Sequence, residues 1–311
     1  MALGKIGVIF CGGKFRGAFG AGFSKALWEK AKPDYIQGVS VGALNGAKLI
    51  ESGPDALKKI WLGEVEVIGP SCLFHKTDMV TRLFKSSLFT DSGLNWLLSK
   101  LDLSKVVNSA THFEIVTRKR SENCLEIFSN REISQEKLLK VIKASVSVGG
   151  FFPKVEIDGD YYSDGYYFSL ESAAKFGCDT IFVVINDQVY DGTDVQDLHW
   201  MREIFSDFNF LLDELIGAKI TSFLEHHKDF QLFEAETPWP VYKKVFEGLK
   251  AFLTNIVSGD NLDMVSHRLV IISPKIYIPT LSDNGFKKGD LTQLFEHGEE
   301  CGRYILKKLG L

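Results

Sequence analysis

Long apolar runs are missing from this chain of 311 residues. No stretch approaches the roughly 20 uninterrupted apolar residues that a membrane-spanning helix needs. The segment Met1–Lys5 leads straight into a short apolar run, without the charged region, long apolar core and cleavage site of a secretory signal. We therefore expect a soluble, cytoplasmic protein, with export by a route that needs no such signal as the alternative.

Cysteine is scarce and basic residues show no surplus. The five cysteines are widely spaced and form no C-x-x-C pair, which favours free thiols in a reducing compartment and no metal site. With 36 Lys and Arg against 40 Asp and Glu, the net charge is -4. This balance argues against a nucleic-acid partner. Linkers rich in serine, glycine or proline and internal repeats are also absent.

What is present is an alternation of short apolar segments with helical patterns. The first half begins strand, helix, strand, helix, over Ile6–Cys11, Ala18–Lys30, Tyr35–Gln37 and Val41–Ser52. Gly53-Pro54 is expected to stop the second helix. This order predicts a parallel sheet covered by helices.

The rest of the chain extends this pattern. Further strands are expected at 113–117, 125–128, 155–157, 161–162, 180–185 and 268–272, and helices at Ser134–Ser147 and Leu291–Leu309. Asp158-Gly159 is the expected tip of a hairpin. The predicted fold class is α/β, a three-layer α/β/α arrangement with a mostly parallel central sheet. We expect a single domain over 1–311 with a helical insertion at about 197–259.

A serine flanked by glycines stands between the second strand and its helix. The segment Gly38-Val39-Ser40-Val41-Gly42 has the G-x-S-x-G form of a nucleophile elbow, a tight turn that lifts the serine hydroxyl clear of the backbone. The short pattern also occurs by chance, and a helix N-cap serine is the structural alternative. Its place after an apolar strand and before a helix favours the elbow.

A glycine-rich loop, Gly12-Gly13-Lys14-Phe15-Arg16-Gly17, follows the first strand. Acyl hydrolysis develops an oxyanion, and a loop of this kind can aim backbone N–H groups at one point. The spacing differs from the G-x-G-x-x-G of dinucleotide sites, and no G-K-[ST] of a Walker loop is present. Arg16 either braces the loop or contacts a phosphate headgroup.

Loop and elbow together resemble the patatin-like phospholipases. The loop is similar to their G-G-G-x-R-G segment, and the elbow stands at the family's usual short distance from it. The segment from Ala144 to Pro153 is similar to their A-S-x-A…F-x-P, and Asp164-Gly165 to their D-G-[GA]. The resemblance extends over about residues 5–190 and the final helix.

This resemblance implies specific roles. Ser40, between the elbow glycines Gly38 and Gly42, would be the nucleophile. Asp164 would be the general base, and the reaction would need no metal or cofactor. The amides of Gly12, Gly13 and Lys14 would form the oxyanion hole, supported by Arg16 and Gly17. The implied activity is that of a phospholipase A or lysophospholipase, a carboxylic-ester hydrolase that forms an acyl-enzyme. Its partner would be a phospholipid or other lipid ester, met in transient contact with a membrane surface.

Three residues depart from the family pattern: Lys14 replaces the third glycine of the loop, Tyr166 follows Asp164-Gly165, and Val41 follows the serine. One alternative is therefore a catalytically weakened relative that binds lipid or a protein partner. The other is a Ser-His-Asp esterase, for which order along the chain admits five histidines: His199, His226, His227, His267 and His297.

Aromatic and aliphatic residues form stripes at helical spacing in the expected insertion at 197–259, beginning with Ile204, Phe208 and Leu211. These stripes predict either a second hydrophobic core or the wall or lid of an acyl-chain pocket.

Overall fold

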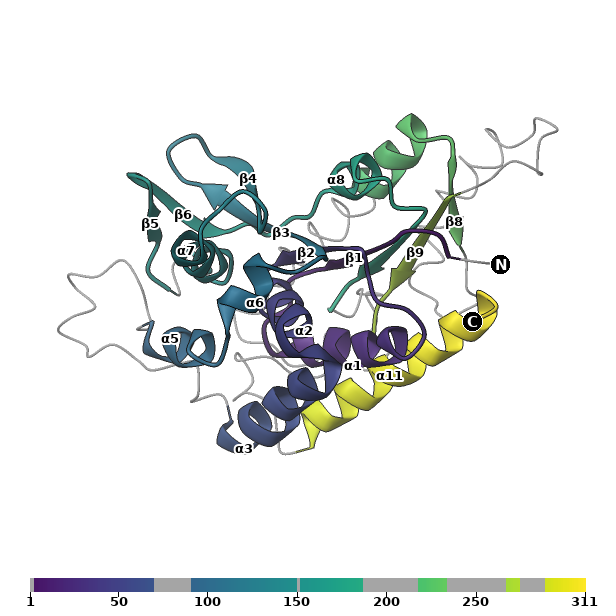
Figure 1. Cartoon of the computed structure of the whole chain (residues 1–311), viewed down its shortest axis with the longest axis horizontal. Helices are drawn as coiled ribbons and strands as arrows, with labels where there is room; N and C mark the ends of the chain where they lie inside the picture. Colours follow the sequence, from purple (N-terminus) through teal and green to yellow (C-terminus); the bar gives the residue numbers. More distant parts are fainter. Residues whose placement is uncertain (1–2, 70–90, 150–151, 187–217, 234–266, 275–288) are drawn as a thin grey trace, which may run out of the picture.

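The computed structural model describes residues 3–69, 91–149, 152–186, 218–233, 267–274 and 289–311. These residues form a nine-stranded sheet with helices on both faces (Figure 1). The strand order is β5-β6-β3-β2-β1-β7-β9-β8, and β4 also pairs with β3.

The centre of the sheet is parallel. The strand β1 (Ile6–Phe10) pairs with β2 (Tyr35–Val39) on one side and with β7 (Thr180–Val184) on the other. The strand β3 (His112–Lys119) extends the parallel part beyond β2. All residues of β1, β2 and β7 are buried, which explains why the sequences of β1 and β7 are almost continuously apolar and do not alternate.

Three antiparallel strands complete the edge beside β3. They are β4 (Cys124–Ser129), β5 (Val155–Ile157) and β6 (Asp160–Asp164). Asp158 and Gly159 both have positive φ, 51° and 86°, and join β5 to β6. The hairpin expected at this dipeptide is therefore confirmed.

The opposite edge corrects one expectation. The strand β9 (His267–Ile272) pairs in parallel with β7, and β8 (Phe230–Phe233) pairs in parallel with β9. The expected helical insertion at 197–259 thus contains an edge strand of the sheet. Residues 218–226 are helical, and the remainder of the insertion lies outside the described residues. The four-residue strand was too short to stand out beside the helical stripes, and β9, its partner, begins 34 residues later.

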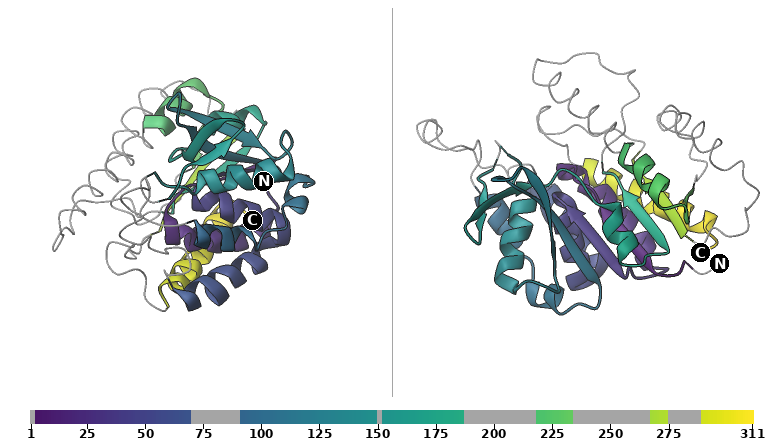
Figure 2. Two further views of the ribbon diagram at one scale, coloured as in Figure 1. Left: turned by 90° about the vertical axis from the view of Figure 1, so that its left-hand side faces the viewer. Right: turned by 90° about the horizontal axis from the view of Figure 1, so that it is seen from above.

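Helices form a layer on each face of the sheet (Figure 2). One face carries α1 (Gly17–Trp28), α2 (Val41–Lys58) and α11 (Asp290–Lys308). The other carries α8 (Leu170–Lys175) and the helix at 218–226. This arrangement confirms the predicted three-layer α/β/α class with a mostly parallel sheet.

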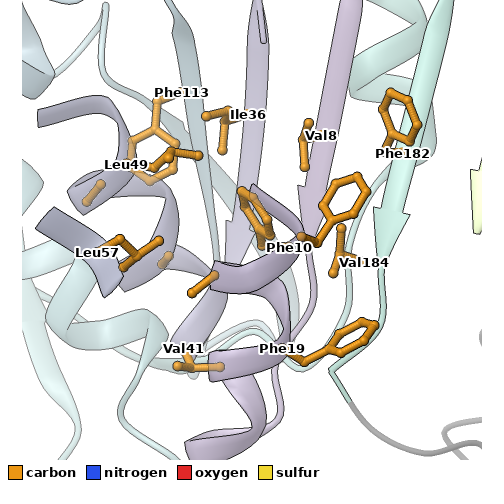
Figure 3. Close-up of a cluster of buried hydrophobic side chains, with 14 of the residues drawn as sticks. Val8, Phe10, Phe19, Ile36, Val41, Leu49, Leu57, Phe113, Phe182 and Val184 are labelled. Carbon is orange, nitrogen blue, oxygen red and sulfur yellow. The ribbon is translucent and has the colours of Figure 1, made fainter. Parts of the chain in front are cut away.

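Alternate side chains of β1 enter the two cores. Val8 and Phe10 pack with α1 and α2 on one face, whereas Ile9 packs on the other face with residues of α8 and the 218–226 helix. Figure 3 shows the first core around Phe10, where Ile36, Phe113 and other side chains of neighbouring strands converge. This core fixes the position of α2 relative to the sheet.

The helix α2 is not continuous. Gly53 has φ 78° and ψ -178° inside it, and Pro54 follows, so the stop expected at Gly53-Pro54 is a kink after which the chain resumes a helix. A π-helix, Lys59–Val65, and the short α3 (Glu66–Ile68) come next. The described residues between there and β5 also form α5 (Ser92–Leu98), α6 (Leu103–Val107) and α7 (Gln135–Ser145). Within the described residues no helix is long and apolar enough to cross a membrane.

Candidate active site

Ser40 occupies the sharp turn between β2 and α2. Its backbone has φ 56° and ψ -127°, a conformation that costs a residue with a side chain about 1–3 kcal/mol and persists only where the surroundings impose it. The turn is held from the helix side, because the Ala43 amide donates to the Ser40 carbonyl at 2.9 Å. Such strain at a serine of the G-x-S-x-G pattern is the geometry of a nucleophile elbow.

The two glycines of the elbow permit close packing. A Cβ atom on Gly38 would lie 2.5 Å from the Cα of Ala43, and one on Gly42 would lie 2.1 Å from the carbonyl oxygen of Phe10. Both distances are below the 3.0 Å that real Cβ contacts essentially never undercut. The strand and the helix can therefore meet at Ser40 only with glycine at these positions.

The strand β3 brings Asp164 to Ser40. Val39, the last residue of β2, pairs with Val116 of β3, while Asp164 of β6 pairs with the next residue of β3, Thr117. Because β4 occupies the other edge of β3, β2 and β6 follow each other along the same edge. Ser40 and Asp164 consequently face each other, and the Ser40 hydroxyl is close enough to the Asp164 carboxyl to lower its pKa.

The end of α7 anchors both residues. The Ser145 hydroxyl accepts a hydrogen bond from the Ser40 amide at 2.9 Å and donates one to the Val116 carbonyl at 2.8 Å. Two residues on, the Ser147 carbonyl accepts from the Asp164 amide at 3.0 Å. The segment resembling A-S-x-A therefore has a positioning role that the sequence alone did not reveal.

The Asp164 carboxyl is only 2% exposed. Burial raises its pKa from 3.8 to about 6, against the opposing effects of the Ser40 hydroxyl, the Tyr166 amide and the nearby charge of Lys14. The Tyr166 amide donates to Oδ1 at 2.9 Å. A carboxylate with this pKa, beside a serine hydroxyl, can accept the proton of that hydroxyl near neutral pH.

The glycine loop passes directly beside Ser40. A Cβ on Gly12 would lie 3.3 Å from the Cβ of Ser40, and Gly13 has φ 139°, which side chains rarely allow. Neither the Gly12 nor the Gly13 amide has a hydrogen-bond acceptor in the part of the chain that the structure describes. Two backbone donors next to the serine are what an oxyanion hole requires.

Lys14, the third predicted member of that hole, has φ 53°. Its N–H is retained, but the positive φ costs a lysine about 1 kcal/mol relative to glycine. Burial lowers the pKa of the Lys14 ammonium and repulsion from Arg16 adds to this effect, whereas attraction to Asp164 opposes it. Lys14 thus places a positive charge close to the Ser40–Asp164 pair.

Arg16 and Gly17 lie where the loop enters α1. Arg16 is 7% exposed, and its amide donates to the Gly13 carbonyl at 3.0 Å. The Asn45 side chain of α2 donates to the Gly17 carbonyl at 2.7 Å and accepts from the Trp61 indole at 2.9 Å. The bond to Gly17 joins the end of the loop to α2. The role of Arg16 as loop support stays a prediction.

A cavity opens beside Ser40 and is almost wholly apolar. Its described lining comes from the loop, α2, the π-helix, the α5 region and the segment after α7: Lys14, Phe15, Ser40, Val41, Leu44, Asn45, Lys48, Leu57, Ile60, Trp61, Val65, Leu94, Leu97, Leu101, Val146, Val148 and Phe152. The wall of an acyl-chain pocket, one of two alternatives for the stripes in 197–259, stays a prediction, because most of that segment lies outside the described residues. The four-residue spacing of Ser40, Leu44 and Lys48 is the sequence pattern that could have indicated the part of the cavity wall along α2.

The described histidines lie away from the pair. His267 begins β9 at the opposite end of the parallel strands from Ser40 and forms ion pairs with Asp179 and Asp229. His227 stacks on Phe223, and His297 packs near Phe19. His226 bonds to a carbonyl of its own helix. His199 lies outside the described residues, so the Ser-His-Asp alternative now depends on this histidine.

Within the described ranges, no group of three or more His, Cys, Asp or Glu residues is placed so that it could hold a metal ion. The described cysteines are free thiols, and burial raises the pKa of Cys11, which precedes the glycine loop, to about 12.

Comparisons with known proteins point to one family. The family model described as patatin-like phospholipase matches residues 8–170, a range that includes the loop, the elbow and Asp164. A search of the curated proteins found no match. Among solved structures, the chain is similar to VipD from Legionella pneumophila, with 13% sequence identity and a TM-score of 0.49, over 99% of this chain and 67% of that one.

Proposed function

Because the chain belongs to the patatin-like phospholipase family, we propose that it is a lipid acyl hydrolase in which Ser40 is the nucleophile and Asp164 the general base. The family supports acyl hydrolysis in general, and the dyad and its substrate are our proposal. The observation that carries it is the position of a strained elbow serine beside a buried carboxylate whose pKa is raised to about 6.

In the first half of the reaction, Oγ of Ser40 attacks the ester carbonyl carbon as Asp164 takes the hydroxyl proton. The carbonyl π bond opens and its electron pair moves to oxygen, giving a tetrahedral oxyanion. When the carbonyl re-forms, the bond to the alcohol breaks and the alcohol oxygen receives the proton from Asp164. The products of this half are a free alcohol and an acyl ester on Ser40.

In the second half, water repeats the attack on the acyl-enzyme. Asp164 takes a proton from the water as its oxygen bonds to the carbonyl carbon, and returns that proton to Oγ of Ser40 as the acyl ester breaks. The fatty acid is released with the dyad restored. One carboxylate therefore serves as base and as acid in turn, which requires a pKa close to the working pH.

Charge on the tetrahedral intermediate would be stabilised by the glycine loop. The Gly12 and Gly13 amides lie beside Ser40 without another acceptor in the described residues, and removing one such donor typically costs about 100- to 1000-fold in kcat. The Lys14 amide would be the third donor. Its ammonium adds positive charge near the oxyanion.

The apolar cavity beside Ser40 supports a lipid as the acyl donor. Its hydrophobic lining can remove an alkyl chain from water, at about 0.8 kcal/mol for each methylene buried. Phospholipid and lysophospholipid esters are the substrates we propose, met at a membrane surface.

The direct test is labelling with a fluorophosphonate, which reacts with activated serines. We expect the wild-type protein to be labelled and Ser40→Ala to remain unlabelled, while purified wild-type protein releases fatty acid from dispersed phospholipid or lysophospholipid. Labelling of wild type without any ester hydrolysis would contradict turnover and favour the lipid-binding alternative. Labelling that persists in Ser40→Ala would exclude Ser40 as the nucleophile.

A second comparison separates the dyad from a triad. Asp164→Asn is expected to lose hydrolysis, whereas His199→Ala is expected to keep it within about twofold, because Asp164 of the proposed dyad takes the serine proton directly. Loss of activity in His199→Ala, with the fold retained by circular dichroism, would instead favour the Ser-His-Asp esterase.

A further inference from the structure

One face of α2 and the serine before it contribute three residues to the lining of the cavity. Ser40, Leu44 and Lys48 are spaced by four residues, so they lie one above another on the same side of the helix. All three line the same cavity. With about 1.5 Å of rise per residue, Lys48 lies about 12 Å along the helix from Ser40.

The walls between these two positions are hydrophobic. Leu94 packs with Val146 and Phe152, and Leu44 packs against this cluster. On the other side, the kink at Gly53 and the π-helix bring Leu57, Ile60, Trp61 and Val65 to the cavity. A π-helix offsets side chains from regular helical spacing, which is why such segments often accompany functional sites.

Lys48, about 12 Å along α2 from Ser40, is a charged member of this lining. The Lys48 ammonium donates to Oε2 of Glu51 at 2.6 Å and to the carbonyl of Lys100 at 2.9 Å. The Lys48 and Glu51 side chains are only 12% and 7% exposed. Lys100 in turn pairs with Glu64 of the π-helix at 2.9 Å. These bonds hold Lys48 in place between two walls of the cavity.

A fixed ammonium group does not accept a hydrocarbon chain beside it, because the chain would displace hydrogen-bond partners without replacing them. We propose that the cavity is the acyl-chain channel and that Lys48 closes its end, so that the enzyme selects chains of about eight to ten carbons, the extended length that fits about 12 Å. This inference rests on the proposed hydrolysis at Ser40.

The test is a chain-length profile. Hydrolysis of p-nitrophenyl esters of saturated acids from about four to about sixteen carbons is measured as kcat/KM. We expect a rise of about three- to fourfold per added carbon while each methylene enters the channel, then a maximum at about eight to ten carbons and a fall of at least about tenfold by fourteen. A profile that keeps rising to sixteen carbons would overturn the proposal.

Two variants should move the maximum in opposite directions. Lys48→Ala with Glu51→Gln removes the charged end without leaving a buried carboxylate unpaired, and its maximum should shift to about fourteen carbons or more. Leu44→Phe narrows the channel midway and should shift the maximum to about six or fewer.

The matched control is Lys25→Ala with Glu299→Gln, which removes another partly buried ion pair, at 3.0 Å between α1 and α11. Its profile should equal that of wild type.

A binding measurement separates this proposal from the reaction itself. Saturated fatty acids are titrated into Ser40→Ala by calorimetry, alone and with the Lys48→Ala and Glu51→Gln changes added. Tightest binding at about eight to ten carbons, extended by the added changes, supports the channel even if no ester is cleaved. Equal binding of all chain lengths, or binding unaffected by the changes at Lys48 and Glu51, overturns it. Failure of hydrolysis alone contradicts only the proposed function.

Discussion

Replacing Asp164 by Asn should inactivate the protein and stabilise it at the same time. Asn has the same shape and can still accept the hydrogen bond from the Tyr166 amide at 2.9 Å. It carries no charge and takes up no proton from Ser40. The substitution therefore removes two things together, the base and the energetic cost of an ionised carboxylate that is 2% exposed.

The magnitude follows from the pKa of Asp164, which burial raises from 3.8 to about 6. A shift of about two pKa units corresponds to about 3 kcal/mol. Because the pKa is higher in the folded state, the stability that this group contributes is fully present below about pH 3.8 and is lost as the pH rises through about 6. Asn does not titrate, so Asp164→Asn should exceed wild type by up to about 3 kcal/mol at pH 8 and by little at pH 4.

The effect on activity has the opposite sign. Without a general base, kcat should fall by about 100- to 10,000-fold. In wild type, where only the ionised Asp164 can accept the serine proton, kcat/KM should decrease below an apparent pKa of about 6. The assay pairs urea unfolding at pH 4 and pH 8 with ester hydrolysis between about pH 4.5 and 9.

Asp158→Asn is the matched control, because Asp158 is also followed by glycine but its carboxylate is exposed at the hairpin tip. There it forms a surface ion pair with Lys137 at 2.6 Å. It should change stability by less than about 1 kcal/mol and leave activity intact. The reasoning would be refuted if Asp164→Asn were less stable than wild type at pH 8, or if the difference between the two proteins did not depend on pH.

Two further substitutions probe the surroundings of the pair. Ser145→Ala deprives the buried Ser40 amide of its acceptor, so we expect a loss of about 1–3 kcal/mol in stability and at least about a tenfold lower kcat with KM little changed. Steady-state kinetics equal to wild type would exclude a positioning role for Ser145. Lys14→Gly relieves a positive φ and should raise the free energy of unfolding by about 1 kcal/mol. Because the Lys14 charge lowers the pKa of Asp164, the acid limb of kcat/KM should also move to higher pH, and a limb that moves to lower pH would contradict this.

Much of the fold could be predicted because its central elements are locally unambiguous. The segments around Ile6 and Thr180 are short, continuously apolar and bounded by turn residues, and both are buried parallel strands. Phe230–Phe233 was not predicted, because its strand character comes from pairing with β9 at the sheet edge and not from its own pattern. Pairing with distant residues is the information that a local pattern lacks.

The candidate site shows the same division. Ser40 and the glycine loop were found from short motifs, and Asp164 from its position relative to them. The register that places Asp164 next to Ser40, on neighbouring residues of β3, could not be found in this way. Nor could the hydrogen bonds of Ser145. The cavity lining from the kinked helix and the π-helix could not be found either, because its residues are gathered from several elements and form no single local pattern.

The hairpin of β5 and β6 places Asp164 beside Ser40, which is 124 positions earlier in the chain. It does so because β6 pairs with β3 beyond the point where β2 ends. During synthesis, the elbow can be complete while the nucleophile still has no partner. If Ser40 and Asp164 act as proposed, the nascent protein would attack no ester until this two-stranded unit has docked. Local opening of the same unit would then remove the proposed base while the parallel centre of the sheet stays folded.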